Sequence, residues 1–241
     1  FSPTYLKTIH NQLSAILNHA VNMYGLKDNV ARKAGTMGKE ENKEMEFWTQ
    51  EEFQKFLECV ADKPISYYAF EMLYWAGIRE GELLAMTPAD FNFEKKTLRI
   101  NKSYQRLEGE DVITDPKTPK SNRTIVMPDF LAIEMEDFIK SIYGIKMNDR
   151  IFTISKSYLH HEMDRGAKLA GVKRIRIHGL RHSHISLLIN LGFSALAIGE
   201  RVGHEAIDIT YHYAHLFPTV QTDMAAQLET EREALVNVKK E

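Results

Sequence analysis

The chain has 241 residues, of which 44% are hydrophobic and 27% are charged, so it is long enough for one large domain with a smaller companion. Its 31 Lys and Arg residues balance its 33 Asp and Glu residues, which excludes a protein that is basic throughout. The single cysteine, Cys59, excludes an internal disulfide, and no apolar run reaches the roughly 20 residues of a membrane span. These features favour a cytoplasmic protein that does not associate with a membrane.

The first segment is predicted to be a small helical domain, residues 1–34. Apolar side chains recur every three or four positions from 4 to 24, which predicts an amphipathic helix that ends at Gly25. Residues 35–46 are polar and lack apolar periodicity, which predicts a linker. Because the chain begins with Phe1 rather than Met, we expect it to be part of a longer protein.

A larger domain is predicted from 47 to 219, and it opens with helices. Thr49 and Glu52 have the spacing of a capping box, which starts a helix that runs to about Val60. The next segment is apolar on most sides and is therefore expected to be a buried helix. A short helix follows it and ends before a proline. These two helices are expected at 66–76 and 77–87.

Residues 97–127 differ in character from the helices before them. Short β-branched runs alternate with turn residues there, which predicts a small three-stranded antiparallel sheet with strands at 97–100, 111–114 and 123–126. The chain is thus expected to be mainly helical with one small sheet, an α+β class. The helices that follow are expected at 130–143, 156–170, 182–191, 194–201, 208–215 and 220–236.

The stretch from His178 to His184, HGLRHSH, is the strongest candidate for a site. It holds one Arg and three His, and an apolar run follows it directly. We expect it at the start of a buried helix, where free N–H groups and the helix dipole attract anions. From Arg165 to His184 there are six Lys and Arg residues and no acid, which indicates a local basic face. The pattern predicts a phosphate site.

Arg79 and two lysines are further candidates, and each has a plainer alternative. Arg79 either pairs with Glu82 one helical turn later or grips two phosphate oxygens with its guanidinium group. Lys117 and Lys120 lie in a turn rich in Pro, Ser and Asn, where they are either solvated or reach a phosphodiester and donate a proton. No Gly-rich phosphate loop or G-x-S-x-G pattern occurs, so ATP chemistry and serine hydrolysis are not expected.

The histidines raise the question of a metal site. His178 and His182 are four apart, a spacing seen in helical zinc sites, but a glycine stands where a zincin has Glu. We therefore expect neither a metal nor a cofactor, and we interpret His182 and His184 as packed or hydrogen-bonded helix residues. Tyr211 and Tyr213 are two apart, so only one of them can face a given site.

Together, these residues resemble the tyrosine recombinase, or phage integrase, family. In chain order the sequence has G-I-R-E-G-E-L, P-K-T, H-G-L-R-H, G-H and T-Y-H-Y-A-H, which is the family's order of Arg, Lys, His-x-x-Arg, His and Tyr. The resemblance covers roughly residues 47 to 225, and residues 1–34 resemble the end of a helical core-binding domain. It implies the recombinase catalytic fold and an integrase of a temperate phage or integrative conjugative element. The rest of the N-terminal region would lie outside this chain.

The resemblance implies a role for each matching residue. Tyr213 matches the nucleophile that forms a 3′-phosphotyrosyl intermediate, and Arg79 and Arg181 match the clamps on the scissile phosphate. Lys117 matches the general acid for the 5′-hydroxyl leaving group, although Lys120 lies in the same turn. The positions that match supporting groups are His178, His204 and Glu82. The residues expected to contact DNA are Lys120, Arg123, Lys173, Arg174, Arg176 and His182.

The function implied is site-specific DNA recombination that integrates or excises a mobile element, including a viral genome. The implied partners are double-stranded DNA with attachment or core sites, a homotetramer on synapsed DNA formed from monomers in solution, and accessory directionality and host factors. The phosphotyrosyl bond keeps the energy of the broken phosphodiester, so neither ATP nor metal is required. The location implied is the bacterial cytoplasm, at the nucleoid when DNA is bound. The C-terminal segment, 220–241, would dock on a neighbouring protomer and switch Tyr213.

Three other functions compete with this one. A type IB topoisomerase-like relaxase would use the same residues on a single duplex, and only synapsis of two sites would separate the two activities. A DNA-binding regulator could have the fold without cleaving DNA. A metal-dependent nuclease would be sensitive to EDTA.

Overall fold

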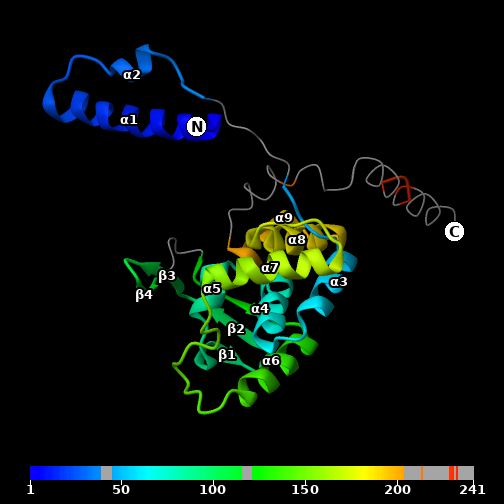
Figure 1. Cartoon of the computed structure of the whole chain (residues 1–241). Helices are drawn as coiled ribbons and strands as arrows, with labels where there is room; N and C mark the ends of the chain where they lie inside the picture. Colours follow the sequence, from blue (N-terminus) through cyan, green and yellow to red (C-terminus); the bar gives the residue numbers. More distant parts are fainter. Residues whose placement is uncertain (39–44, 116–120, 204–212, 214–227, 231, 233–241) are drawn as a thin grey trace. The chain divides into compact units, whose positions relative to one another are not determined.

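The computed structural model describes residues 1–38, 45–115, 121–203, 213, 228–230 and 232 (Figure 1). The chain divides into two units, Phe1–Met45 and Glu46–Glu241, and each is described by itself. The division falls in the segment that the sequence predicts to be a linker. Among the described helices, none combines the length and the apolar character that crossing a bilayer requires.

The first unit is a long helix with a short one folded against it. Helix α1 (Pro3–Tyr24) ends where Gly25 adopts a left-handed φ of 69°, as the sequence predicts. Helix α2 (Val30–Lys33) is not predicted from the sequence. Asn29 caps it and also donates its side-chain amide to the Ser14 carbonyl at 2.8 Å, which ties α2 to α1. Because the contact between Asn29 and Ser14 joins residues 15 positions apart, no local sequence pattern reveals this helix.

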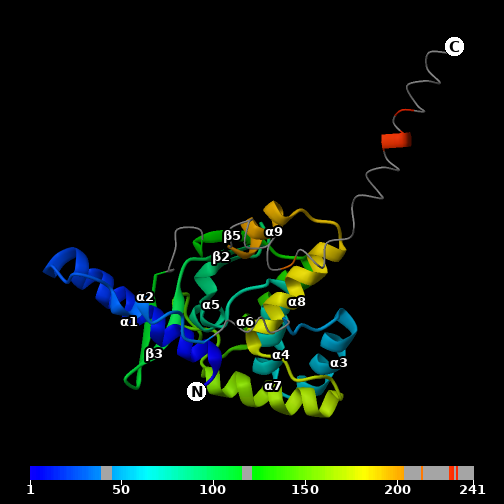
Figure 2. The same ribbon diagram turned by 90° about the horizontal axis from the view of Figure 1, so that it is seen from above.

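Helix α4 (Pro64–Trp75) lies at the centre of the second unit, where it contacts four other helices (Figures 1 and 2). Helix α3 (Gln50–Val60) packs on it and starts at the predicted capping box, in which Thr49 and Glu52 each bond the other's backbone N–H. Helix α5 (Glu80–Ala85) follows and is shorter than predicted, because Gly77 has a left-handed φ of 62° and Arg79, the N-cap residue, is extended. Next comes a short 3₁₀ turn, η1 (Pro88–Asp90).

The strands form two separate sheets. Strands β1 (Phe91–Asn92), β2 (Thr97–Ile100) and β5 (Arg123–Val126) make an antiparallel sheet in the order β1-β2-β5. Strands β3 (Ser103–Leu107) and β4 (Glu110–Thr114) pair only with each other, and Figure 1 shows this hairpin extending away from the helices. A three-stranded sheet is therefore present. However, the sequence prediction that residues 111–114 belong to it is wrong, because they pair with a strand whose mixed polar composition hid it.

Four further helices complete the described part of this unit, and the last two lie near β5 in Figure 2. The predicted start of the third at residue 182 is wrong. That helix begins five residues earlier, so the HGLRHSH stretch fills its first two turns, which agrees with the expectation that the stretch starts a buried helix. The expected helices 208–215 and 220–236 lie outside the described residues, apart from a few positions. The four helices are α6 (Asp129–Ser141), α7 (Lys156–Ala170), α8 (Ile177–Asn190) and α9 (Ala195–Val202).

An aromatic cluster joins α3 to α4. The Phe53 ring stacks on Tyr74 with ring centroids 3.8 Å apart, and Phe56 meets Phe70 edge-on at 4.8 Å. Helix α7 approaches this cluster closely at Gly166, where a Cβ atom would lie 2.4 Å from the Phe56 ring. These contacts bury large apolar areas and fix α4, on which the site residues depend. The predicted class, mainly helical with a small antiparallel sheet, is confirmed.

One carboxyl group in this core is not paired with a cation among the described residues. Glu71 on α4 is 4% exposed, and its Oε2 atom has no hydrogen-bond partner in the described part of the chain. Burial first, and then the charge of Glu134 on α6, raise its pKa to about 7, against an opposing effect of a hydrogen bond from Trp75. The fold therefore favours the protonated form of Glu71.

Glu71→Gln is expected to stabilise the protein above neutral pH. The folded pKa of Glu71, about 7, lies above its ordinary value of 4.5, so the unfolded chain releases the proton first as the pH rises. The stability that protonated Glu71 provides is complete below pH 4.5 and is lost by about pH 7. Gln imitates the protonated carboxyl, so the free energy of unfolding at pH 8 should rise by about 2 kcal/mol.

Urea unfolding at pH 5 and at pH 8 measures this effect. The exposed Glu94 is the matched control, since Glu94→Gln should change the free energy of unfolding little at either pH. An equal gain from Glu71→Gln at both pH values would contradict a titrating Glu71.

Candidate active site

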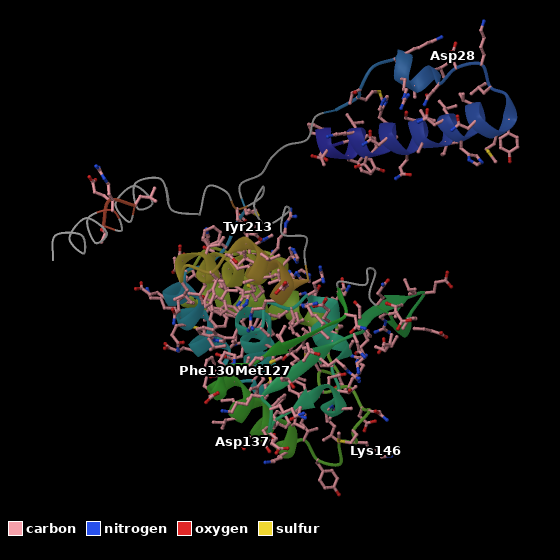
Figure 3. The ribbon with its side chains drawn as sticks, turned by 180° about the vertical axis from the view of Figure 1, so that it is seen from behind. Asp28, Met127, Phe130, Asp137, Lys146 and Tyr213 are labelled. Atoms are coloured by element: carbon pink, nitrogen blue, oxygen red, sulfur yellow. The ribbon has the colours of Figure 1, made fainter. Side chains whose placement is uncertain are left out.

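The polar residues singled out in the sequence meet at one end of the second unit. Figure 3 shows Tyr213 at the end formed by α8 and α9, with Asp137 and Lys146 at the opposite end. Helix α8 supplies three of the predicted groups, the start of α5 supplies two, and β5 supplies one. The site is therefore assembled from segments that are far apart in the sequence.

Arg181 is the most deeply buried cation of the site, with 1% of its surface exposed. Its Nη1 atom donates to the Gly77 carbonyl at 2.6 Å, and its Nη2 atom donates to the Val202 carbonyl. Its Nε atom is buried and has no partner among the described residues. Burial lowers the pKa of Arg181 and the charge of Arg79 lowers it further, yet a guanidinium group stays protonated at neutral pH. The result is a fixed cation with one N–H group that no described residue accepts.

Gly77 makes this arrangement possible through its backbone. Its φ is +62°, and a Cβ atom there would lie 2.3 Å from the His184 ring. His184 is held in turn by Arg201, whose Nε atom donates to the His184 Nε2 atom at 3.1 Å. Burial, followed by the charges of Arg201 and Arg181, lowers the pKa of His184 to about 3, so the ring is neutral. The prediction that His184 is a packed, hydrogen-bonded residue is confirmed.

Gly77→Ala is expected to destabilise the fold by roughly 3 kcal/mol or more. Part of the loss is the strain of a left-handed backbone with a Cβ atom, and part is the clash with the buried His184 ring. Gly144 is a matched control because its φ is +70° and a Cβ atom there would have no other atom within 4 Å. Gly144→Ala should lose only about 1 kcal/mol. Urea denaturation of both variants separates strain from clash, and equal losses would argue against the His184 contact.

Glu82 joins two arginines of the site. Its carboxylate accepts from Arg123 through Nη1 and Nη2, both at 3.0 Å, and from Arg79 Nη1 at 2.8 Å. The backbone N–H of Arg79 also donates to it at 2.8 Å, which caps α5. Burial alone would raise the pKa of Glu82, but the hydrogen bonds and charge of Arg123, followed by those of Arg79, hold it below the ordinary value. Glu82 is therefore a carboxylate at neutral pH.

Of the two alternatives for Arg79, the structure shows the pair with Glu82, and the phosphate contact stays a prediction. Arg79 pairs with Glu82, and its Nη2 atom also donates to the Gly203 carbonyl at 3.2 Å. Its side chain is still 33% exposed, so part of the guanidinium faces solvent. The internal bonds therefore orient Arg79 without enclosing its side chain.

Arg123 was predicted to contact DNA, but in the structure it is buried. Its side chain is buried, and it is bonded to Glu82 and, through Nε at 2.9 Å, to the Arg201 carbonyl. A guanidinium group occupied in this way cannot contact DNA, so the structure corrects the prediction of Arg123 as a DNA-binding residue. Its pairing with Glu82 spans 41 positions along the chain, a distance at which no sequence spacing gives a signal.

His178 lies in the first turn of α8, within electrostatic reach of Arg79 and Arg181. Loss of contact with water lowers the pKa of His178 most. The charges of Arg181 and Arg79 lower it further, whereas the charge of Glu82 raises it. The ring still contacts solvent. A neutral imidazole is thus held next to the position where an anion would bind.

Tyr213 is 2% exposed and contacts His182. The phenol oxygen of Tyr213 and the Nδ1 atom of His182 form a hydrogen bond, and the two ring centroids are 5.8 Å apart. Burial raises the pKa of Tyr213, and the charge of Arg181 partly offsets that rise. Of the two tyrosines that the sequence left open, Tyr211 lies outside the described residues, so the choice between them stays a prediction.

The exposed basic residues next to the site belong to the segment before α8. Arg174 pairs with Asp164 at 2.7 Å, and Arg176 is the exposed N-cap residue of α8. Lys173 lies over the Phe47 ring, 5.9 Å from its centroid. Their positions are compatible with a DNA-facing surface. Three further predicted site residues lie outside the described residues, namely Lys117, Lys120 and His204.

Sequence reasoning missed Arg201 and the backbone acceptors of the site. Arg201 donates to His184 and to the carbonyls of Val126, at 3.0 Å, and Trp75, at 3.3 Å. It thereby ties α9 to β5 and α4. In the sequence it marks only the end of a predicted helix, so no signal distinguishes it. Within the described ranges, no three His, Cys, Asp or Glu side chains gather as metal ligands do.

Comparison with known proteins shows which family the sequence matches. The family model described as "Phage integrase family" matches residues 46–219. The chain is 30% identical over 243 residues to the ICEBs1 integrase of Bacillus subtilis (strain 168), and this alignment covers 93% of the chain and 65% of that protein. It is 28% identical to a XerC-like tyrosine recombinase of Caldanaerobacter subterraneus, over 92% of the chain and 65% of that protein. The chain thus spans about two-thirds of the length of these relatives.

Solved structures share the fold. The Tn1549 transposon integrase, solved in complex with a circular intermediate DNA, has a TM-score of 0.77 at 20% identity, over 96% of this chain and 80% of that one. A λ integrase dimer bound to a COC′ core site has a TM-score of 0.58 at 17% identity, over 83% and 71% of the two chains. The expected catalytic fold is therefore confirmed.

Proposed function

Because the chain belongs to the phage integrase family, we propose that it is a site-specific DNA recombinase that cleaves and rejoins strands through a 3′-phosphotyrosyl intermediate. Tyr213 is the nucleophile, and Arg79 and Arg181 bind the scissile phosphate. Lys117 is the general acid, with Lys120 as the alternative in the same turn. His178, His204 and Glu82 support them.

One observation carries this proposal. The phenol of Tyr213 lies within electrostatic reach of Arg181, a buried cation whose Nε–H has no partner among the described residues. A phosphate oxygen would satisfy that donor, and Arg79 adds a second, partly exposed guanidinium group beside it. Charge-assisted N–H donors fixed in advance stabilise the charge that develops at phosphorus.

The chemistry follows from these groups. The Tyr213 oxygen attacks phosphorus, the bond from phosphorus to the 5′ oxygen breaks, and a general acid protonates the leaving hydroxyl. Two guanidinium groups balance the charge of the pentavalent transition state. The neutral His178 can donate its ring N–H to a phosphate oxygen. A 5′-hydroxyl from a second duplex then reverses the step and joins new strands.

We extend the proposal to the partners. Lys173, Arg174 and Arg176 contact DNA phosphates, so binding should weaken as salt concentration rises. The substrates are attachment or core sites on double-stranded DNA, held in a synaptic homotetramer. Directionality and host factors select integration or excision. The protein acts in the bacterial cytoplasm, on the nucleoid. A C-terminal segment exchanged between protomers would couple the active sites.

Covalent capture tests the proposed reaction. The substrate is a pool of random-sequence duplexes with a nick at a fixed position, so that cleavage near the nick releases a short strand and traps the protein on DNA. Adducts that survive SDS are recovered and sequenced, which also reveals the preferred site. Mass spectrometry of the linked peptide should identify Tyr213. A chain that forms no adduct with any duplex in the pool would refute the proposal.

Strand exchange separates a recombinase from a relaxase. With the recovered site, the recombinase should join strands of two labelled duplexes. A type IB topoisomerase-like enzyme would relax a supercoiled plasmid and join no second duplex. Activity retained in EDTA would exclude the nuclease alternative.

A further inference from the structure

We propose that His182 is a catalytic residue that accepts the proton of Tyr213 through its Nδ1 atom during strand cleavage. The inference rests on the proposed function, because it assigns a role toward the same nucleophile. The sequence placed His182 among the residues that contact DNA. In the structure its ring instead meets the phenol oxygen of Tyr213.

The direction of the hydrogen bond supports proton transfer to His182. Burial raises the pKa of Tyr213, so its oxygen carries a proton at neutral pH. A buried hydroxyl must donate that proton to an acceptor, because an unsatisfied donor is costly. The His182 Nδ1 atom is the partner that the structure gives it. The ring must then hold its own proton on Nε2.

The helix that carries His182 also fixes its ring. His182 follows Arg181, which is anchored by two backbone carbonyls, and the His178 ring meets it edge-on at 4.8 Å. The His182 side chain is partly buried and contacts the His178 ring, and both features restrict its movement. A base held in this way is already within reach of the proton that it must remove.

The step balances as follows. A bond forms between the Tyr213 oxygen and phosphorus, and the Tyr213 proton passes to the His182 Nδ1 atom. The bond from phosphorus to the 5′ oxygen breaks, and that oxygen takes a proton from the separate general acid proposed above. The imidazolium that forms is stabilised by the phosphate, whose negative charge is greatest in the pentavalent transition state, and this offsets repulsion by Arg181. In the joining step the proton returns to the tyrosine oxygen.

Two variants separate proton transfer from positioning. His182→Ala removes the acceptor, whereas His182→Asn places an amide oxygen near the former Nδ1 position that accepts a hydrogen bond but no proton. Both should slow adduct formation by about 10²-fold or more. Imidazole in the buffer should partly restore His182→Ala. His161→Ala, which alters an exposed histidine on α7, is the matched control and should react like the wild type.

A second substrate identifies which proton is involved. The recovered duplex is made with sulfur in place of the bridging 5′ oxygen, because a thiolate leaves without a general acid. His182→Ala should stay slow on this substrate, whereas Lys117→Ala or Lys120→Ala, whichever removes the acid, should recover. Thermal unfolding and DNA-binding measurements accompany every variant to confirm that it folds and binds.

Several results would overturn the inference. These are wild-type rates for His182→Ala, wild-type rates for His182→Asn, or recovery of His182→Ala on the sulfur substrate. The first would show no role, the second positioning alone, and the third action on the leaving group. In each case the wild-type chain still captures DNA, so the proposed function stands. A wild-type chain that captures no DNA would instead refute the proposed function itself.

Discussion

Tyr213→Phe is expected to abolish covalent capture of DNA while leaving DNA binding nearly unchanged. Removal of a nucleophile leaves no side reaction that forms the same bond, so the rate should fall by a factor on the order of 10⁴ or more. The phenylalanine ring keeps the buried contacts of Tyr213, which is 2% exposed. The fold loses only the hydrogen bond with His182, worth about 1 kcal/mol.

Tyr211→Phe is the matched control, since it makes the same chemical change two residues away. It should capture DNA at close to the wild-type rate. Adduct yield in SDS gels and DNA binding by fluorescence anisotropy are measured for both variants. If Tyr213→Phe still trapped DNA and Tyr211→Phe did not, the nucleophile would be Tyr211.

Arg181→Lys is expected to slow cleavage by roughly 10²- to 10³-fold, a loss typical of removing one fixed donor to a transition-state oxyanion. Lysine keeps the positive charge but cannot bond two carbonyls and a phosphate oxygen in one plane, as a guanidinium group does. Arg181→Ala should be slower still. It should also lose about 3 kcal/mol of stability, because the carbonyls of Gly77 and Val202 lose their buried donor.

Single-turnover adduct formation at saturating protein concentration measures the effect of Arg181 on the chemical step, and anisotropy measures binding. Arg99→Lys, on an exposed position of β2, is the matched control and should change neither. A variant of Arg181 that lost binding and cleavage in equal proportion would show a residue that only binds DNA.

Local signals in the sequence predicted helix ends well. Gly25 ends α1, and Thr49 with Glu52 begins α3, because each depends on residues within one helical turn. The start of α8 was misplaced because its local pattern is misleading. Its first turn contains His178 and Arg181, whose polar side chains face the site and interrupt the apolar periodicity. Strand β3 escaped prediction because its apolar residues, Tyr104 and Leu107, do not alternate with its polar ones.

The role of each site residue depended on contacts that no local pattern contains. The pair of Arg79 and Glu82 was foreseen as one of two alternatives, because these residues are three apart. The burial of Arg123 against Glu82 and the contact of His182 with Tyr213 were not foreseen. The partners in these two contacts are 41 and 31 positions apart in the sequence. They meet only because the folded chain brings β5 and α8 to the site.

These long separations determine when the site can form during folding. The bond from Arg181 to Gly77 spans 104 positions, and the bond from Arg79 to Gly203 spans 124. Contacts between distant segments close large loops, and they therefore form late. A chain still on the ribosome with α8 unsynthesised has neither Arg181 nor Tyr213, and its Arg79 lacks the bond to the Gly203 carbonyl. Under the proposed function, strand cleavage thus requires a chain that has been synthesised through Tyr213.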